Sequence, residues 1–322
     1  MPLYPLRFEP RFRRYLWGGR KLGTLLGKSI GEGSDYAESW EVVDRGADQS
    51  RVVAGPFAGM SLGELMSTHG AELLGRHYPQ LRFPLLLKFL DCNKTLSVQV
   101  HPDDKMAARL NPPDLGKTEA WVVLAADPGS LIYAGLKRGF DRAALAREVQ
   151  RGTCELCLHR IEPKVGDFVF LPAGAVHALG AGLVIAEIQQ SSDATFRLFD
   201  WNRFGTDGQP RPLHVEQSLD AIDYALGPLS PQRPQPTEQP CVQRLVGCDK
   251  FVLDRWQFEQ PRTIGGDERF HLVAVLAGSV QIAEDPTGKP LQTGQTMLLP
   301  AGLGKCQLAP TQPTTMLDIY LP

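Results

Sequence analysis

Short apolar runs separated by glycine, proline and aspartate follow one another along most of the chain, and this spacing restricts the fold more than any other feature. With 32 glycines and 26 prolines among 322 residues, few stretches are long enough for a helix without a breaker. The pattern therefore predicts a mainly β fold with helical insertions. The predicted strands are FPLLLKFLD, TLSVQVH, EAWVVLA, SLIYAGL, DFVFLPA and LVIAEIQQ, followed in the C-terminal part by FVLDRWQFE, HLVAVLA, SVQIAED and TMLLPAG.

Three segments with helical patterns interrupt the strands. Residues 61–78 begin with a capping box, a serine followed three residues later by a glutamate. Residues 141–152 begin with an aspartate and end with a glycine, the residue types that favour the two ends of a helix. A shorter helix is predicted for residues 103–110, before an Asn-Pro-Pro sequence that stops it.

An internal repeat divides the chain. GDFVFLPAG at 166–174 and GQTMLLPAG at 294–302 share a glycine turn, an apolar strand and a Leu-Pro-Ala-Gly corner, and the upstream runs WVVLA and VAVLA also match. Residues 228–240 are too rich in proline for the interior of a helix or strand, which predicts a linker. We therefore expect one domain over residues 1–227 and a related barrel over residues 241–322.

The stretch LSVQVHPDD, residues 96–104, raises the question of function. In a strand the side chains alternate between two faces. Leucine and valines at 96, 98 and 100 should then face the core, and Ser97, Gln99 and His101 should lie together on the opposite face. If that face looks into a barrel, these polar groups converge on a site.

Four residues of the first repeat copy have the right chemistry for one divalent metal: Gln99, His101, Glu119 and His177. Imidazole nitrogens with carboxylate and amide oxygens suit zinc or a neighbouring first-row ion, and they leave positions open for substrate oxygens. His177 lies three residues after the first LPAG corner, whereas Lys305 occupies that place in the second copy. We therefore expect the C-terminal barrel to lack metal ligands and to be purely structural.

Several motifs in order resemble those of the type I mannose-6-phosphate isomerases, in the short bacterial form, of the cupin superfamily. The motifs are LSVQVHPDD, GKTEAW, GDFVFLPAGAVHALG and QSSDATFRLFDW, and the similarity extends from YLWGG and AESWEV to RPLHVEQSL. The resemblance implies two jelly-roll cupin barrels, with one zinc ion per chain. It also implies a metal-dependent interconversion of mannose 6-phosphate and fructose 6-phosphate through an enediolate.

The family's metal ligands correspond to His101, Glu119 and His177, together with Gln99. The reaction also needs a base that moves a proton between two neighbouring carbons. Glu187, on the predicted strand LVIAEIQQ, is the first candidate for that base. The alternative is that Glu187 only orients a metal ligand.

The substrate's phosphate requires cations. Lys88 interrupts an apolar run and is expected to face a polar cavity, because burial of an unpaired ammonium is costly. Lys117, two residues before Glu119, and Ser97 match substrate-contacting positions of the family, with Lys117 as the next candidate for the base. Arg197 matches the family's active-site arginine; the alternative is a surface ion pair. Trp17 is either a sugar-stacking platform or a packing residue.

The cysteines and charges exclude other classes of function. Cys154 and Cys157 form a CxxC in a stretch that alternates like a strand, and without a second pair nearby they are expected to be ordinary core residues. A net charge of −2 gives no support for binding to nucleic acid or to a membrane. The N-terminal arginines replace the apolar stretch of a signal peptide, so we expect a cytoplasmic protein.

Two alternative functions remain open at this point. One is a cupin isomerase or epimerase that acts on another sugar or sugar phosphate. The other is a non-catalytic sugar-sensing cupin. The sequence does not decide between a monomer and a homodimer.

Overall fold

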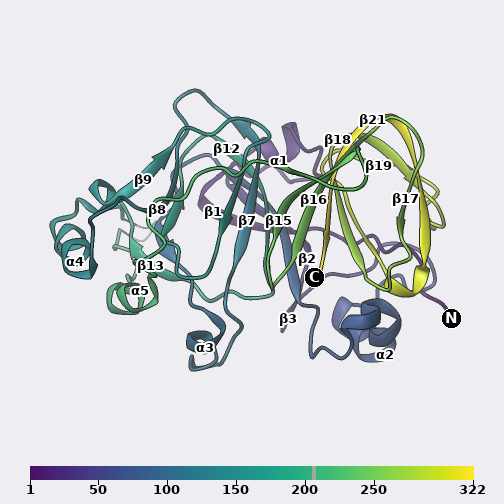
Figure 1. Cartoon of the computed structure of the whole chain (residues 1–322), viewed down its shortest axis with the longest axis horizontal. Helices are drawn as coiled ribbons and strands as arrows, with labels where there is room; N and C mark the ends of the chain where they lie inside the picture. The colour runs from purple at the N-terminus through teal and green to yellow at the C-terminus, as the bar shows by residue number, and fades with distance from the viewer. Residues whose placement is uncertain (205–207) are drawn as a thin grey trace.

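The computed structural model describes residues 1–204 and 208–322, and strands dominate it (Figure 1). A six-stranded antiparallel sheet has the order β1-β2-β5-β12-β7-β10, and a five-stranded sheet has the order β13-β6-β11-β8-β9. The strands of the first sheet are β1 (Arg11–Gly19), β2 (Tyr36–Val42), β5 (Leu85–Cys92), β12 (Leu183–Gln190), β7 (Glu119–Ala126) and β10 (Phe168–Leu171). Those of the second are β13 (Phe196–Phe199), β6 (Val98–Val100), β11 (His177–Leu179), β8 (Ile132–Leu136) and β9 (Leu158–Ile161).

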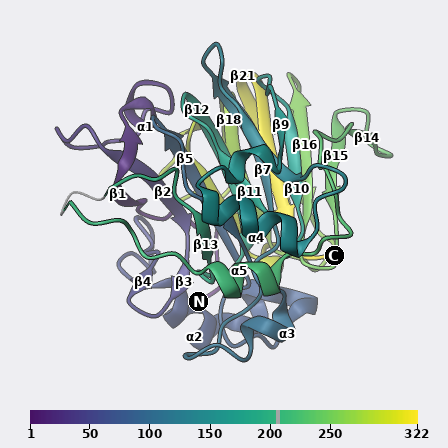
Figure 2. The same cartoon turned by 90° about the vertical axis from the view of Figure 1, so that its left-hand side faces the viewer.

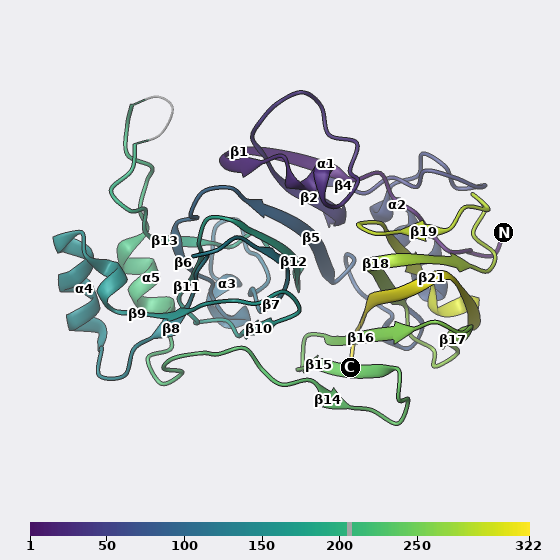
Figure 3. The same ribbon diagram turned by 90° about the horizontal axis from the view of Figure 1, so that it is seen from above.

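These two sheets enclose a common apolar interior, and we call them together the N-terminal barrel. Viewed from above, its strands curve round into a barrel (Figure 3). Strand β7 shows how the alternation builds it: Trp121 and Val123 belong to the interior cluster, whereas Val122 belongs to a cluster on the outer face. Any polar residue on this strand that lies an even number of positions from Trp121 therefore faces the interior.

The C-terminal barrel consists of strands β14–β21, which curve around a second apolar cluster. Its strands are β14 (Gln235–Pro236), β15 (Val242–Gly247), β16 (Val252–Phe258), β17 (Arg262–Gly265), β18 (His271–Ile282), β19 (Leu291–Gln292), β20 (Thr296–Leu299) and β21 (Lys305–Tyr320). The outer faces of both barrels share one core: Val122 and Ile188 belong to the same cluster as Leu272 and Ile319. The barrels therefore lie back to back, with separate interiors.

The helices lie outside the barrels (Figure 2). The chain forms α1 (Lys21–Thr24), α2 (Leu62–Leu74), α3 (Asp104–Ala107), α4 (Arg142–Arg151) and α5 (Val215–Ala221), with 3₁₀ turns at Gly75–His77, Cys154–Leu156 and Ala301–Leu303 and a two-stranded ribbon of β3 (Asp44–Arg45) and β4 (Asp48–Gln49). The capping box of α2 and the Asp141 and Gly152 caps of α4 are confirmed. Helix α3 is shorter than predicted. None of the helices in the described residues is long and apolar enough to cross a membrane.

Three local predictions were wrong. Leu96 precedes β6 and belongs to the interior cluster, whereas Val98 and Val100 pack on the outer face, because the strand begins only at Val98. The CxxC stretch forms a 3₁₀ turn rather than a strand, although both thiols are buried and free as expected. The runs HLVAVLA and SVQIAED form one continuous strand, β18. The register shifts between them, at Gly278, whose φ of 84° lets the strand continue past the irregularity.

The proline-rich segment 228–240 runs along the N-terminal barrel before it enters the C-terminal one. Pro228 forms a bridge with Gly135, and the backbone N–H of Gln232 donates to the carbonyl of Phe168 at 3.1 Å. The N-terminus crosses in the other direction, since Leu6 pairs with Leu298. The predicted domain limits stay a prediction, because the two barrels share a core and exchange these segments.

Candidate active site

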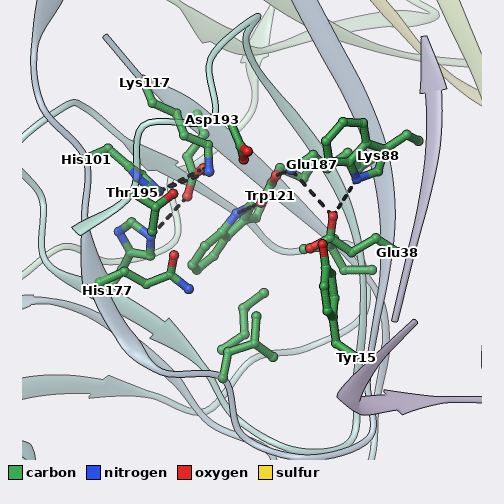
Figure 4. Close-up of a pocket in the computed structure, with 16 residues that line it drawn as sticks. Tyr15, Glu38, Lys88, His101, Lys117, Trp121, His177, Glu187, Asp193 and Thr195 are labelled. Carbon is green, nitrogen blue, oxygen red and sulfur yellow. Dashed lines mark hydrogen bonds and ion pairs between the residues drawn. The ribbon is translucent and has the colours of Figure 1, made fainter. Parts of the chain in front are cut away.

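A cavity of about 100 Å³ opens inside the N-terminal barrel. Figure 4 shows the 16 residues that line it. The predicted site residues among them are Lys88, Gln99, His101, Lys117, Glu119, His177 and Glu187. They come from strands β5, β6, β7, β11 and β12 or from the residues next to them, so both sheets contribute to the same site.

His101, Glu119 and His177 form a compact cluster. Figure 4 shows His101 and His177 at one end of the cavity, opposite Lys88 and Glu38. Their ligand atoms all lie within 4.8 Å of one another. The Nε2 atom of His101 is 3.5 Å from Oε2 of Glu119, and Nε2 of His177 is 3.3 Å from Oε1 of the same carboxylate. All three side chains are buried.

Backbone carbonyls determine which nitrogen of each histidine faces the cluster. The Nδ1 atoms of His101 and His177 each lie 2.9 Å from a carbonyl oxygen, that of Ala194 and of Ala175 respectively. Because a carbonyl only accepts, each Nδ1 carries the proton, and each Nε2 presents its lone pair toward Glu119. Burial lowers the pKa of both histidines, which favours the neutral form that binds metals.

The donor set fits a divalent metal ion. Both carboxylate oxygens of Glu119 are buried without a hydrogen bond, although the Lys117 ammonium lies 2.7 Å from Oε2 and 3.0 Å from Nε2 of His101. Lys117 offsets the charge of this carboxylate, but Oε1 and the Nε2 lone pair of His177 face each other at 3.3 Å with neither a proton nor a cation between them, which is costly on burial. Two nitrogen ligands and one carboxylate are typical of open zinc sites. Gln99 pairs with His177 across β6 and β11 and lines the cavity beside this cluster.

A second cluster of charges lies at the other end of the cavity. The Lys88 ammonium is 3.4 Å from Oε1 of Glu187 and 3.6 Å from Oε2 of Glu38, and the Trp121 indole donates to Oε2 of Glu187 at 3.1 Å. Burial raises the pKa of Glu187, but the charges of Lys117 and Lys88 lower it further, so the net shift is downward. The carboxyl group of Glu187 is therefore ionised at neutral pH.

Three predicted residues do not line the cavity. Ser97 is buried outside it. Trp17 belongs to the interior cluster and stacks on Tyr15, with ring centroids 5.6 Å apart. The Arg197 guanidinium donates from Nη1 to the carbonyl of Pro212 at 2.9 Å, and its Nε has no hydrogen bond. Their roles in substrate binding or catalysis stay predictions.

The sequence reasoning missed several residues of the cavity wall, among them Tyr15, Glu38, Trp121 and Asp193. Two of them carried a signal. Trp121 lies two residues after Glu119 on β7, and Glu38 alternates with buried neighbours on β2. Period-two alternation from a known interior residue could therefore have found Trp121.

Comparisons with known proteins agree with this geometry. A family model described as phosphomannose isomerase type I, catalytic domain, matches residues 6–119. Mannose-6-phosphate isomerase ManA of Bacillus subtilis is 34% identical over 312 residues, which is 96% of this chain and 96% of that protein. The crystal structure of the mannose 6-phosphate isomerase from Bacillus subtilis superposes with a TM-score of 0.90 at 29% identity, covering 99% of this chain and 100% of that one.

A more distant structure, a mannose 6-phosphate isomerase bound with zinc and yttrium, superposes with a TM-score of 0.77 at 16% identity. It covers 99% of this chain and 100% of that chain, and at this identity the likeness shows the fold alone. The relationship rests on the full-length match at 34% identity, together with the family model. The chain belongs to the type I phosphomannose isomerase family.

Proposed function

We propose that this protein interconverts mannose 6-phosphate and fructose 6-phosphate. The observation that carries the proposal is one cavity with a metal-competent cluster at one end and an ionised glutamate paired with Lys88 at the other. An aldose–ketose isomerisation needs both parts, because a proton has to move between C1 and C2 while negative charge develops on two oxygens.

His101, Glu119 and His177 would hold one zinc ion per chain, with Gln99 as a neighbouring oxygen donor. Bound there, the metal would stabilise negative charge on the substrate oxygens. The two backbone carbonyls behind the histidines orient the rings for this task.

Glu187 is the proposed base. Its carboxylate is buried and ionised, and its direct contacts are the Lys88 ammonium and the Trp121 indole, at the end of the cavity opposite the His101 and His177 rings. This favours proton transfer over the alternative role of orienting a metal ligand. Lys88 and Lys117, together with the two positive charges of a bound divalent metal, would offset the four carboxyl groups of the cavity wall and allow an anionic substrate to bind.

The cavity has to widen for a sugar phosphate. Its volume of about 100 Å³ is below the ~300–1,000 Å³ typical of small-molecule sites. Among its lining residues, Tyr15 is 42% exposed and Asp193 is also exposed, so these side chains can move without loss of core packing. We propose that substrate entry displaces them.

Formation of fructose 6-phosphate from mannose 6-phosphate, measured in a coupled assay before and after treatment with a chelator, tests the function. We expect turnover that the chelator abolishes and that added zinc restores. Unphosphorylated mannose should be a much poorer substrate. Equal turnover of mannose would indicate an isomerase of another sugar, and tight binding without entry of solvent deuterium into product carbon would indicate a sugar sensor.

Replacing Arg197 by lysine tests the one predicted catalytic residue that lies off the cavity. If its guanidinium leaves Pro212 and binds the substrate's phosphate or oxyanion, loss of the planar fork should lower kcat/KM well beyond the effect of a surface change. Arg160→Lys is the matched control, because Arg160 is an exposed residue over the ring of Tyr133. Equal kinetics of the two variants with mannose 6-phosphate would exclude Arg197 from the site.

We also propose that residues 1–227 form the catalytic unit and residues 241–322 a second barrel packed against it, joined by 228–240, within which β14 already pairs with the second barrel. Every residue that lines the cavity precedes residue 200, which supports this division. A sugar phosphate is the proposed partner of a cytoplasmic protein, either a monomer or a homodimer. The near-neutral charge supports a small-molecule partner over nucleic acid.

A further inference from the structure

The C-terminal barrel contains a second cavity, of about 370 Å³. Its wall includes four buried polar side chains, Asp254, His271, Asp318 and Tyr320, and residues 237–239 lie at its edge. A barrel with a purely structural role would not need charged groups inside it, since each loses its hydration on burial. This cavity therefore requires an explanation.

Strand pairing gives His271 the same place in the second barrel that Glu119 has in the first. In the LPAG repeat, Leu171 of β10 pairs with Glu119 on β7, and Leu299 of β20 pairs with His271 on β18. The sequences EAWVVLA and HLVAVLA start at these two residues. A metal-ligand position thus corresponds to a histidine in the second barrel.

The same correspondence holds on the next strand. Glu187 of β12 pairs with Trp121, two residues after Glu119, and Asp318 of β21 pairs with Val273, two residues after His271. The proposed catalytic base therefore has a carboxylate counterpart, Asp318, that also faces the interior of its barrel.

Two more strands extend the match. Lys88 on β5 pairs with Glu187, and Asp254 on β16 pairs with Asp318. Beyond them, β2 pairs with β5 and β15 with β16, and Arg244 of β15 pairs with Asp254. The strand order β2-β5-β12-β7-β10 is thus repeated as β15-β16-β21-β18-β20. The second cavity therefore has the same place in the C-terminal barrel that the catalytic cavity has in the N-terminal barrel.

The chemistry of the second cavity differs from that of the first. Nδ1 of His271 is 2.8 Å from Oδ1 of Asp318, and Nε2 is 3.1 Å from Oδ1 of Asp267, so neither ring nitrogen is available to a metal. Burial lowers the pKa of His271, but the carboxylates of Asp318 and Asp267 raise it further, to about 10. The imidazolium joins two carboxylates instead of binding a cation.

Arg244 and Tyr320 satisfy the remaining buried carboxylate. The Arg244 guanidinium donates to both oxygens of Asp254, and the Tyr320 hydroxyl donates to Oδ2 at 2.9 Å. With Glu238, the wall carries four carboxyl groups against the two cations Arg244 and His271. The catalytic cavity has the same balance of side chains, but a divalent metal bound there would add two positive charges, which the second cavity has no free ligands to hold. An anion such as a phosphate is therefore disfavoured in the second cavity.

We propose that this cavity binds a neutral, hydroxyl-rich molecule of sugar-like chemistry, without a metal and without catalysis. The carboxylates accept hydrogen bonds from hydroxyl groups, and the Arg244 guanidinium donates to hydroxyl oxygens. The rings of Trp256 and Tyr320 in the wall offer apolar surface to the C–H faces of a sugar. The volume lies within the ~300–1,000 Å³ range of small-molecule sites. The proposed site is independent of the proposed isomerase reaction, and it would give the C-terminal barrel a role beyond the structural one expected from the sequence.

Calorimetric titration of the full chain with D-mannitol, a polyol with neither carbonyl nor phosphate, tests the proposal. We expect saturable binding of one mannitol per chain that persists in His177→Gln, after chelation, and in the presence of mannose 6-phosphate. Thr263→Trp, which introduces a large side chain at an exposed position of the wall, and Arg244→Gln should each weaken binding by about tenfold or more. Both variants should keep wild-type isomerase activity.

Thermal unfolding shows whether the variants are folded. If Arg244→Gln proves unstable, Thr263→Trp alone tests the site, because Thr263 is exposed and its replacement should leave the fold intact. Absence of saturable binding to the wild-type chain would overturn the proposal. Loss of binding in His177→Gln, or competition by mannose 6-phosphate, would place mannitol in the catalytic cavity instead and would equally overturn it.

Discussion

Replacing His177 by alanine is expected to remove the metal from the protein while the fold remains soluble. Among residues 1–204 and 208–322, one group of His, Cys, Asp and Glu side chains converges, and His177 is one of its three members. Loss of His177 leaves one imidazole and one carboxylate in that group. Loss of a group behind a ligand typically costs about 10–100-fold in metal affinity or activity, and loss of a ligand itself should exceed ~100-fold. Metal content by elemental analysis, with turnover of mannose 6-phosphate, measures the effect.

His159→Ala is the matched control, because His159 is a partly exposed histidine on β9, away from the cavity. It should leave about one metal ion per chain. The wild-type protein should contain no second metal, because both ring nitrogens of His271 in the C-terminal barrel are hydrogen-bonded to carboxylates. Undiminished metal in His177→Ala, or two ions per wild-type chain, would show that the metal site has been assigned wrongly.

Replacing Glu187 by glutamine is expected to lower kcat by about a hundredfold to ten-thousandfold while zinc stays bound. Glutamine keeps the size of the side chain and can still accept from the Trp121 indole, but it cannot take a proton from carbon. Because the net pKa shift of Glu187 is downward, the loss should be similar at every pH between about 6 and 8, where the wild-type carboxylate is ionised. Exchange of the C2 proton with solvent deuterium should fall in parallel.

Glu38→Gln separates catalysis from charge balance. Glu38 and Glu187 both lie close to the Lys88 ammonium, at 3.6 and 3.4 Å, so either change removes one counter-charge of the same lysine. If Glu187 is the base, only Glu187→Gln removes it. The kcat of that variant should then be lower than the kcat of Glu38→Gln by at least about tenfold. Equal losses would mean that both carboxylates serve Lys88, and Lys117 would become the next candidate for the base.

Local features of this protein could be predicted from sequence because their causes lie within a few residues. The caps of α4 involve the helix's own first and last turns. The strand Leu183–Gln190 follows from eight residues of β-type pattern between turns. The candidate metal cluster was also predictable, because residue chemistry and the repeated LPAG corner suggested its ligands and motifs of a known family supported the same residues.

Residues whose place depends on a strand's first residue were predicted less well. Ser97 and Leu96 were assigned to faces by assuming that the strand begins before them, yet β6 starts at Val98. Residues before the start of a strand do not follow its alternation, so the faces of Leu96 and Ser97 could not be read from it. Arg197, on β13, was assigned to the site by resemblance, and the structure turns its guanidinium toward Pro212.

The sequence by itself determined the mainly β character, the helix caps, the repeated LPAG corner and the identity of the metal cluster. The tertiary structure alone decided that Lys88 and Glu187 meet, and that Asp254, His271 and Asp318 line a second cavity. The physical reason is that alternation and capping depend on neighbours in the chain, whereas convergence depends on strand order and register. Those are decided when apolar faces distant in the sequence pack together, as the outer faces of the two barrels do here.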